Sequence, residues 1–256
     1  MTTSATPRGL LFGAAAESYE RFRLGYPDEV VDRTLAYAGR PVRTAVEVGS
    51  GTGKATRAFA SRGVRITALE PDPNMFTVLQ RESIAMPVTP VHTRFEEYDG
   101  PSVDLLYAAA AWHWTEPETR WTRTAHLLVE DGVVAIFGSP MSLVDPHVQA
   151  AVEEARRPYL SDDSFRPPDG GPADGRRWPA WELDGCDLFT DVQDLVLARE
   201  VVVPQKEYVG YLSTVSAYLQ LTVRQRQEVL MRISEVLPPQ VRLDAGVRLC
   251  LARKAG

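Results

Sequence analysis

The stretch AVEVGSGTGKAT, residues 45–56, places three glycines at alternate positions between an apolar run and a helical pattern. Glycine adopts left-handed backbone conformations without steric cost, and a turn without side chains lets a ligand lie against the backbone. A strand, a glycine turn and a helix in this order are typical of folds with parallel strands and crossover helices. The stretch therefore favours an α/β fold with a ligand at this turn.

The first 140 residues continue this rhythm, because short β-branched runs alternate with helical patterns. Such alternation predicts parallel strands joined by helices. Strands are predicted at residues 43–49, 64–70, 87–92, 102–108 and 132–138, and helices near 53–62, 73–81 and 116–128. Each strand is apolar enough to be covered on both faces of the sheet.

The third of these helices has a start signal of its own. Thr115 is followed three residues later by Glu118, which is the spacing of a capping box, and Trp121, Ala125 and Leu128 recur at helical spacing. We expect this helix to begin directly after Thr115.

The sequence changes character after Pro140. A helix is predicted near 146–157, and proline and glycine are too dense in residues 166–179 for a regular element, which indicates a long loop. Strand character returns at 191–204 and 241–254, with helical stretches near 205–219 and 223–236 between them. We expect two late strands that extend the sheet at one edge, within a single domain.

Composition narrows the possible partners. The 256 residues carry a net charge of −6, and their basic residues are scattered, so DNA and long RNA are poor partners. No apolar run approaches the roughly 20 residues that span a bilayer, and the start lacks a secretory signal, so we expect a cytoplasmic protein. Two isolated cysteines, Cys186 and Cys250, predict buried thiols with neither a redox pair nor a metal site.

The glycine turn can be compared with three kinds of nucleotide-binding loop. A P-loop needs a glycine where Val48 stands and a serine or threonine where Ala55 stands, so it is rejected. The NAD fingerprint needs its third glycine where Lys54 stands, so Lys54 disfavours an NAD-binding loop. The pattern E/D-x-G-x-G-x-G, the loop that holds the methionine part of S-adenosylmethionine, fits without adjustment, because Glu47, Gly49, Gly51 and Gly53 fill it.

A carboxylate stands one βα unit later, where ITALEPDPNM ends a strand with Glu70. A carboxylate at this place can accept both ribose hydroxyls of a nucleotide, which suits NAD and S-adenosylmethionine equally. The alternative is that Glu70 is a solvated residue at a strand end.

Taken together, the motifs resemble the class I S-adenosylmethionine-dependent methyltransferases, in particular a small-molecule branch similar to trans-aconitate methyltransferase. The segments that carry the resemblance are AAAESYERFRLGYP, EVGSGTGKAT, LEPDPNM, FEEY, AAAAWHW and YLSTVSAYLQL, in this order along the chain. The resemblance implies a Rossmann-like fold with a mostly parallel seven-stranded sheet, helices on both faces and an N-terminal and late helical cap. It divides the single domain into a lid at 1–40, a cofactor-binding core at 41–138, substrate-cap insertions and sheet edge at 139–236, and a last strand at 237–256.

The resemblance also implies roles for individual residues. Those expected to bind S-adenosylmethionine are Tyr19, Glu47, Gly49, Gly51, Gly53, Glu70, Pro71, Met75, Arg94, Phe95, Ala109 and Ala110. Arg94 stands where many relatives carry an aspartate that accepts from the adenine, so backbone atoms around it are the alternative contact. The residues expected to bind the substrate are Arg23, Tyr26, Trp112 and Trp114, with Arg23 facing a carboxylate. The alternative for Tyr19 and Arg23 is a helix that merely covers the sheet edge.

His113 is the candidate catalytic residue, because it leaves a strand beside the expected methyl group. It would act as a general base for a hydroxyl or acidic carbon, or else form a wall of the pocket. The implied reaction is methylation of oxygen, carbon or nitrogen on a small organic molecule by a monomer or homodimer. The alternatives are a nicotinamide-dependent oxidoreductase and a methyltransferase fold that binds the cofactor without methyl transfer.

Overall fold

The computed structural model describes residues 13–139, 141–161, 179–183 and 185–256. They belong to two compact units, each built from three chain segments. Of the described residues, the first unit comprises 13–24, 141–161 and 198–246, and the second comprises 25–139, 179–197 except 184, and 247–256. Each unit is described by itself, and the single domain with the boundaries given above stays a prediction. The long loop expected at 166–179 lies, up to residue 178, outside the described residues.

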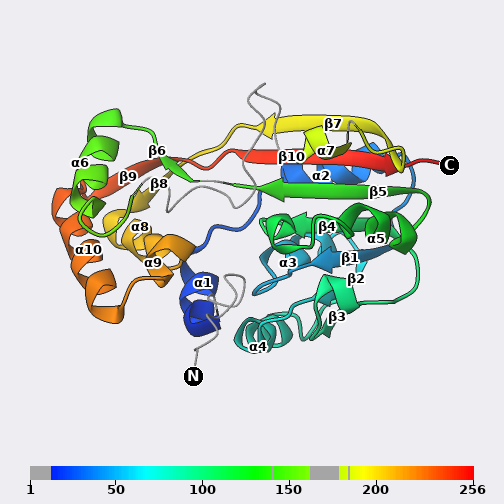
Figure 1. Ribbon diagram of the computed structural model, residues 1–256, viewed down its shortest axis with the longest axis horizontal. Helices are drawn as coiled ribbons and strands as arrows, with labels where there is room; N and C mark the ends of the chain where they lie inside the picture. The colour runs from blue at the N-terminus through cyan, green and yellow to red at the C-terminus, as the bar shows by residue number, and fades with distance from the viewer. Residues whose placement is uncertain (1–12, 140, 162–178, 184) are drawn as a thin grey trace. The chain divides into compact units, whose positions relative to one another are not determined.

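The second unit is built on a seven-stranded sheet (Figure 1). Its strands, in spatial order, are β3 (Val88–Val91), β2 (Arg65–Leu69), β1 (Thr44–Val48), β4 (Val103–Ala109), β5 (Leu128–Gly138), β10 (Val247–Lys254) and β7 (Phe189–Leu197). The first five are mutually parallel, and β10 is antiparallel to both β5 and β7. The expected mostly parallel sheet, extended at one edge by late strands, is confirmed.

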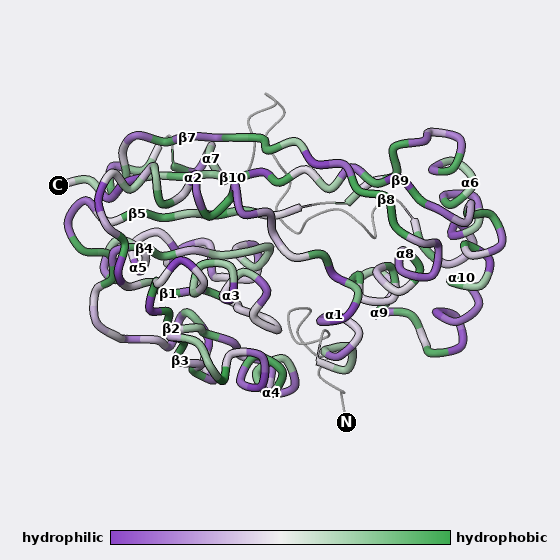
Figure 2. The backbone as a smooth tube through the Cα atoms, turned by 180° about the vertical axis from the view of Figure 1, so that it is seen from behind, coloured by the Kyte–Doolittle hydropathy of each residue, from purple (hydrophilic) through white to green (hydrophobic). Residues whose placement is uncertain are grey.

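Both faces of this sheet are buried, as side-chain alternation along β4 shows. Leu105 and Tyr107 belong to one hydrophobic cluster, whereas Leu106 and Ala108 belong to another. Helices α2 (Asp28–Ala38) and α3 (Lys54–Ala60) contribute to the first cluster, and α5 (Arg120–Leu127) and α7 (Ala180–Leu183) to the second. Figure 2 shows hydrophobic residues along much of β5, in keeping with a strand covered on both faces.

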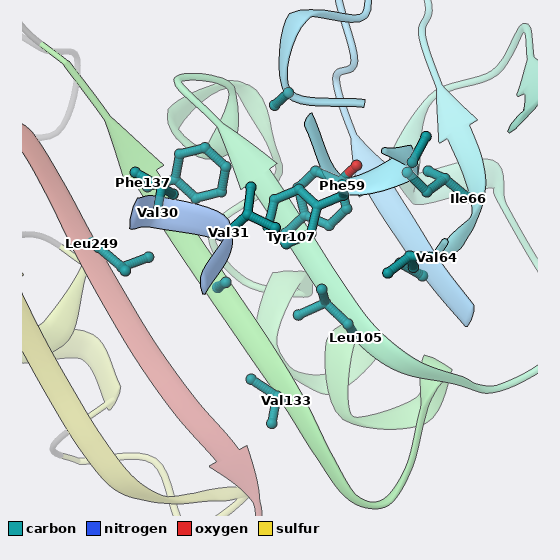
Figure 3. Close-up of a cluster of buried hydrophobic side chains, with 14 of the residues drawn as sticks. Val30, Val31, Phe59, Val64, Ile66, Leu105, Tyr107, Val133, Phe137 and Leu249 are labelled. Atoms are coloured by element: carbon teal, nitrogen blue, oxygen red, sulfur yellow. The ribbon is translucent and has the colours of Figure 1, made fainter. Parts of the chain in front are cut away.

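Phe59 of α3 lies at the centre of the first cluster. Its ring stacks on that of Tyr107, with centroids 4.3 Å apart, and Val30 and Val31 of α2 approach the same face of the sheet (Figure 3). All four side chains have no exposed surface. Burying a side chain of this size contributes about 1.5–3 kcal/mol, so this cluster fixes α3, and with it the glycine turn that precedes α3.

The helix expected to begin after Thr115 begins later. Helix α5 starts at Arg120, and Thr119 precedes it without a side-chain capping bond, so the predicted capping box is wrong. The physical reason is that the Thr115 hydroxyl donates at 2.7 Å to the carbonyl of Trp112, in the short 3-10 turn η4 (Trp112–Trp114). The helix at 73–81 is confirmed as α4 (Pro73–Glu82).

The first unit combines helices with a small antiparallel sheet. Its helices are α1 (Ala16–Phe22), α6 (Pro146–Arg156), α8 (Gln205–Leu212), α9 (Ser216–Leu219) and α10 (Val223–Val236). Its strands are β6 (Ser142–Leu143), β9 (Gln240–Asp244) and β8 (Glu200–Pro204), in that spatial order. Buried tyrosines of α8 and α9 share its core with valines and leucines of α10, β8 and β9.

The two long late strands of the prediction are each divided between the two sheets, which the sequence did not indicate. Residues 191–204 supply β7 and β8, and residues 241–254 supply β9 and β10. The breaks coincide at Arg199 and Ala245, where the Ala245 N–H donates to the Arg199 carbonyl at 2.8 Å. The helix predicted at 205–219 is likewise interrupted, because the Thr214 hydroxyl donates to the Tyr211 carbonyl at 2.7 Å between α8 and α9.

Candidate functional site

The glycine turn follows β1 and leads into α3. Gly49, Gly51 and Gly53 have φ angles of 64°, 57° and 88°, a region that favours glycine. A Cβ at Gly49 would lie 2.6 Å from the Cβ of Ala111, whereas a Cβ at Gly51 would meet nothing within 4 Å. The turn is therefore tight on the side of Gly49 and open at Gly51, where a ligand can approach the backbone.

Glu47 lies beneath this turn and is 1% exposed. Its Oε2 accepts hydrogen bonds from the Thr56 hydroxyl of α3 and, at 3.1 Å, from the Tyr107 hydroxyl of β4. Tyr107 is its partner across β1 and β4, which explains how the two side chains meet. Burial raises the pKa of Glu47 to about 8, against the opposing effect of these donors. Sequence reasoning missed both partners. Tyr107 could be found only from the pairing of β1 with β4, and Thr56 only from the way α3 packs beside Glu47.

Glu70 follows β2 and connects two turns. Its Oε2 accepts from the Gly51 N–H at 2.7 Å, and its Oε1 accepts from the Asp72 N–H at 2.8 Å. Glu70 is 6% exposed, so its interpretation as a solvated strand end is wrong. Burial raises its pKa to about 7. Since a carboxylate oxygen has two lone pairs, each oxygen retains one for a further donor.

The segment after Glu70 is shaped by Asp72. The Asp72 carboxylate accepts from the backbone N–H groups of Asn74 and Met75, at 2.9 and 3.0 Å, and so caps α4. Met75 is consequently buried, while Pro71 is partly exposed. The structure thus places Glu70, Pro71 and Met75 at one strand end beside the glycine turn.

Arg94 and Phe95 follow β3 and differ in burial. Phe95 is buried and packs against Trp112, with ring centroids 5.8 Å apart. The Arg94 side chain is 56% exposed and lies 3.7 Å from the carboxylate of Glu96. An exposed arginine in this position can contribute little beyond its backbone to a buried contact.

The end of β4 is a strained turn at Ala110. This alanine has a φ of 55°, which costs an L-residue roughly 1–2 kcal/mol, and its N–H donates at 2.7 Å to the carbonyl of Phe137. Ala109 is partly buried and Ala110 is exposed. Strain of this kind is common where a backbone is held for a ligand.

The aromatic residues after this turn have different environments. Trp112 is 1% exposed and packs against Phe95 and Trp121 in the core, so its ring supports the strand end, and its part in substrate binding stays a prediction. His113 and Trp114 are half-buried, with ring centroids 4.4 Å apart. Tyr26 is also half-buried and meets Phe137 edge-on at 4.9 Å.

Tyr19 and Arg23 belong to the first unit. The guanidinium of Arg23 lies over the rings of Tyr19 and Tyr211, at 5.0 and 4.7 Å from their centroids. Its Nε donates to the Thr214 hydroxyl at 2.8 Å, and its Nη2 donates to the Thr214 carbonyl at 2.9 Å. The late motif YLSTVSAYLQL contains Tyr211 and Thr214, but the sequence did not indicate that these two residues hold Arg23.

The described part of the chain has neither a membrane-spanning helix nor a group of metal ligands. No described helix has the length and hydropathy needed to cross a bilayer, and no three described His, Cys, Asp or Glu side chains are grouped to hold a metal ion. Of the two cysteines, Cys250 is buried as expected, whereas Cys186 is partly exposed, so the prediction of two buried thiols is wrong for Cys186.

Comparison with known proteins points to one domain type. Residues 46–136 match the methyltransferase domain family. An uncharacterized methyltransferase of Mycobacterium tuberculosis is 38% identical over 133 residues, which are 52% of this chain and 53% of that protein. The chain therefore aligns with about half the length of this relative.

Solved structures share the fold. A structure from Anaeromyxobacter dehalogenans, assigned as a type II methyltransferase, aligns with a TM-score of 0.62 and 21% identity over 91% of this chain and 98% of that one. Phosphoethanolamine N-methyltransferase 2 of Haemonchus contortus, solved with phosphomonomethylethanolamine and S-adenosylhomocysteine, aligns with a TM-score of 0.53 and 13% identity over 95% of this chain and 58% of that one. The matched residues 46–136 contain the glycine turn, Glu70 and the end of β4.

Proposed function

We propose that this chain is a class I S-adenosylmethionine-dependent methyltransferase and transfers a methyl group from that cofactor to a small organic molecule. The observation that carries the proposal is the 2.7 Å hydrogen bond from the Gly51 N–H to Glu70. It joins the turn after β1 to the carboxylate after the neighbouring strand β2, at the carboxyl ends of both strands. Ligands of open parallel sheets bind at such strand ends.

The residues of this strand end fit the cofactor. The open side of Gly51 leaves the backbone accessible to the methionine part, and both Glu70 oxygens can accept from ribose hydroxyls. Pro71, Met75 and Phe95 would border the adenine. Backbone atoms are the better candidates for contact at Arg94, because its side chain is exposed and lies near Glu96.

The cofactor supplies an activated methyl group on a positively charged sulfonium. The protein then has to align the acceptor with that methyl carbon and exclude water, which can contribute about 7–11 kcal/mol on the scale of well-oriented intramolecular reactions. Ala109 and Ala110 would allow close approach, and the face of Trp114 suits a cationic sulfur. A carboxylate acceptor needs no base, whereas a hydroxyl or acidic carbon is helped by one.

His113 is the proposed base for such an acceptor. Its position after β4, half-buried and beside Trp114, supports this role. A general base must be neutral to accept a proton, so turnover is expected to rise with pH and then level off. His113→Gln should reduce turnover about a hundredfold while cofactor affinity changes less than about threefold. A variant with parent turnover at saturating substrate would leave His113 as a pocket wall.

Calorimetry of the whole chain tests the proposed function. S-adenosylmethionine and S-adenosylhomocysteine should bind with Kd values on the order of micromolar, and NAD should give no heat of binding. Preferential binding of NAD would point to an oxidoreductase. Tight binding of S-adenosylmethionine without methyl transfer to any acceptor would instead indicate a binding module. The lid at 1–40, the core at 41–138 and the substrate cap at 139–236 remain part of the proposal.

A further inference from the structure

His92 directly follows β3 in the second unit and lies beside the turn that follows β2. The Glu70 N–H donates to the Val91 carbonyl at 3.1 Å, so the pairing of the two strands brings His92 next to the residues after Glu70. The Thr93 N–H donates to the same carbonyl at 3.1 Å, which makes His92 the centre of a three-residue turn. An exposed histidine is thereby held at the strand end that carries Glu70.

The side chain of His92 makes two different contacts. Its Nε2 lies 3.0 Å from the carbonyl oxygen of Pro71. A carbonyl can only accept a hydrogen bond, so Nε2 carries the proton and donates it. The ring also stacks on Phe76 of α4, with centroids 5.1 Å apart and planes inclined by 28°. The first contact uses the edge of the ring and the second its face, so each can be removed by a different substitution.

The peptide group between Pro71 and Asp72 connects His92 with Glu70. Its carbonyl accepts from His92, and its N–H donates to Oε1 of Glu70 at 2.8 Å. Because a peptide group is planar, a donor that holds its carbonyl also restricts the direction of its N–H. A hydrogen bond to the carbonyl polarises the group as well, and so strengthens the donation by the N–H. His92 therefore acts on the Glu70 carboxylate through one peptide plane.

The Glu70 carboxylate depends on such donors. It is 6% exposed and forms no ion pair with the described residues. Burial raises its pKa to about 7, and the N–H groups of Asp72 and Gly51 oppose that rise. Oε2 is held by Gly51 at 2.7 Å, and Oε1 by the peptide that His92 contacts. The orientation of Oε1 is thus the part of the carboxylate that His92 controls.

We propose that His92 is a positioning residue for the cofactor, because it holds the peptide that orients Oε1 of Glu70 toward the ribose. The inference rests on the proposed function and adds to it a residue that lies outside the motifs of the family resemblance. His92 acts through the Pro71–Asp72 peptide and Glu70, and this role requires no contact between the imidazole and the cofactor.

Two variants of the whole chain separate the hydrogen bond from the stacking. His92→Phe keeps a ring against Phe76 and removes the donor, whereas His92→Gln keeps an N–H donor and removes the ring. In calorimetry, S-adenosylhomocysteine should bind about fivefold more weakly to His92→Phe, in line with one lost hydrogen bond, and within about twofold of the parent to His92→Gln. Parent affinity in His92→Phe, or equal losses in the two variants, would overturn the inference.

A double-mutant cycle with Glu70→Ala tests whether His92 acts through that carboxylate. His92→Phe should change the affinity less than about twofold once residue 70 has no carboxylate. The same loss in both backgrounds would show that His92 acts by another route, and the inference would fail. The matched control is His126→Phe on α5, which replaces a second exposed histidine of this unit, with 76% of its side chain exposed, and should leave the affinity unchanged.

Nuclear magnetic resonance of the ligand-free protein distinguishes this inference from the proposed function. The ¹⁵N resonances of His92, assigned by their loss in His92→Phe, should show the Nε2–H tautomer. The Asp72 amide should exchange with solvent faster in His92→Phe and at the parent rate in His126→Phe. An Nδ1–H tautomer or an unchanged Asp72 amide in His92→Phe would contradict the role of His92. A parent protein that fails to bind S-adenosylhomocysteine would contradict the proposed function instead, and the Asp72 amide would still report on His92.

Discussion

Replacing Gly49 by alanine tests whether the glycine turn is shaped by contact with the end of β4. The φ of 64° at Gly49 costs an L-residue roughly 1–2 kcal/mol. The added Cβ would also lie 2.6 Å from the Cβ of Ala111, well inside the distance of about 3.5–4.0 Å at which carbon atoms attract. Overpacking of this kind costs about 1–3 kcal/mol, because Ala111 cannot move without its backbone. The free energy of unfolding should therefore fall by about 2–5 kcal/mol.

Gly51→Ala is the matched control, because its φ of 57° is similar and its Cβ would meet nothing within 4 Å. The free energy of unfolding of this variant should fall only by the cost of the left-handed backbone conformation, roughly 1–2 kcal/mol. Urea unfolding of the cofactor-free protein measures both variants, provided that the m-value is unchanged. Adding Ala111→Gly should recover part of the loss in Gly49→Ala but none in Gly51→Ala. Equal losses in the two glycine variants, or no recovery, would refute the contact as the cause.

Three further variants test the carboxylates of the second unit. Glu70→Ala should weaken S-adenosylhomocysteine at least about tenfold in calorimetry, because charge-assisted bonds worth about 1.5–3 kcal/mol are lost; an unchanged affinity with an intact circular dichroism spectrum would contradict this. Burial raises the pKa of Glu47 from its ordinary value of 4.5 to about 8. Protonated Glu47 therefore contributes its full share to the free energy of unfolding below pH 4.5, and this share is lost as the pH rises toward 8. Glu47→Gln should flatten that decline in urea titrations, and a parallel pH profile would speak against it. Glu182→Ala removes the carboxylate that pairs with buried Arg120 and should cost about 3–5 kcal/mol, against about 0–1 kcal/mol for removal of the exposed Glu29; equal losses would refute the role of burial.

The sheet and the glycine turn could be predicted because both have local signals. Near-continuous burial along β1 and β4 follows from apolar runs, and the glycine spacing follows from the backbone angles that the turn requires. Thr115 shows the limit of such signals, because the same residue can cap a helix or close a 3-10 turn. Whether Thr115 caps a helix or closes the turn depends on how Trp112 packs, and the sequence alone does not show this packing.

The partners of the site residues could not be predicted, because they depend on contacts between distant segments. Tyr107 contacts Glu47 because β4 pairs with β1 in the sheet. Along the chain, β2 and β3 lie between these two strands, so the sequence alone does not show that they are neighbours. Arg23 and Thr214 are 191 residues apart. The division of the late strands between two sheets has the same origin, since both segments look continuous until the bond between Arg199 and Ala245 is known.

The position of β10 has a consequence for the order in which the second unit can be assembled. The last strand of the chain pairs with both β5 and β7, so β7 has no other partner within the seven-stranded sheet. During synthesis, β1 to β5 can pair as they emerge, whereas β7 must wait until residues 247–254 have left the ribosome. The exposed edge of β5 stays open for the same interval, and an open strand edge is a template for association between chains. The nascent protein therefore keeps an exposed strand edge until β10 has emerged and paired with β5.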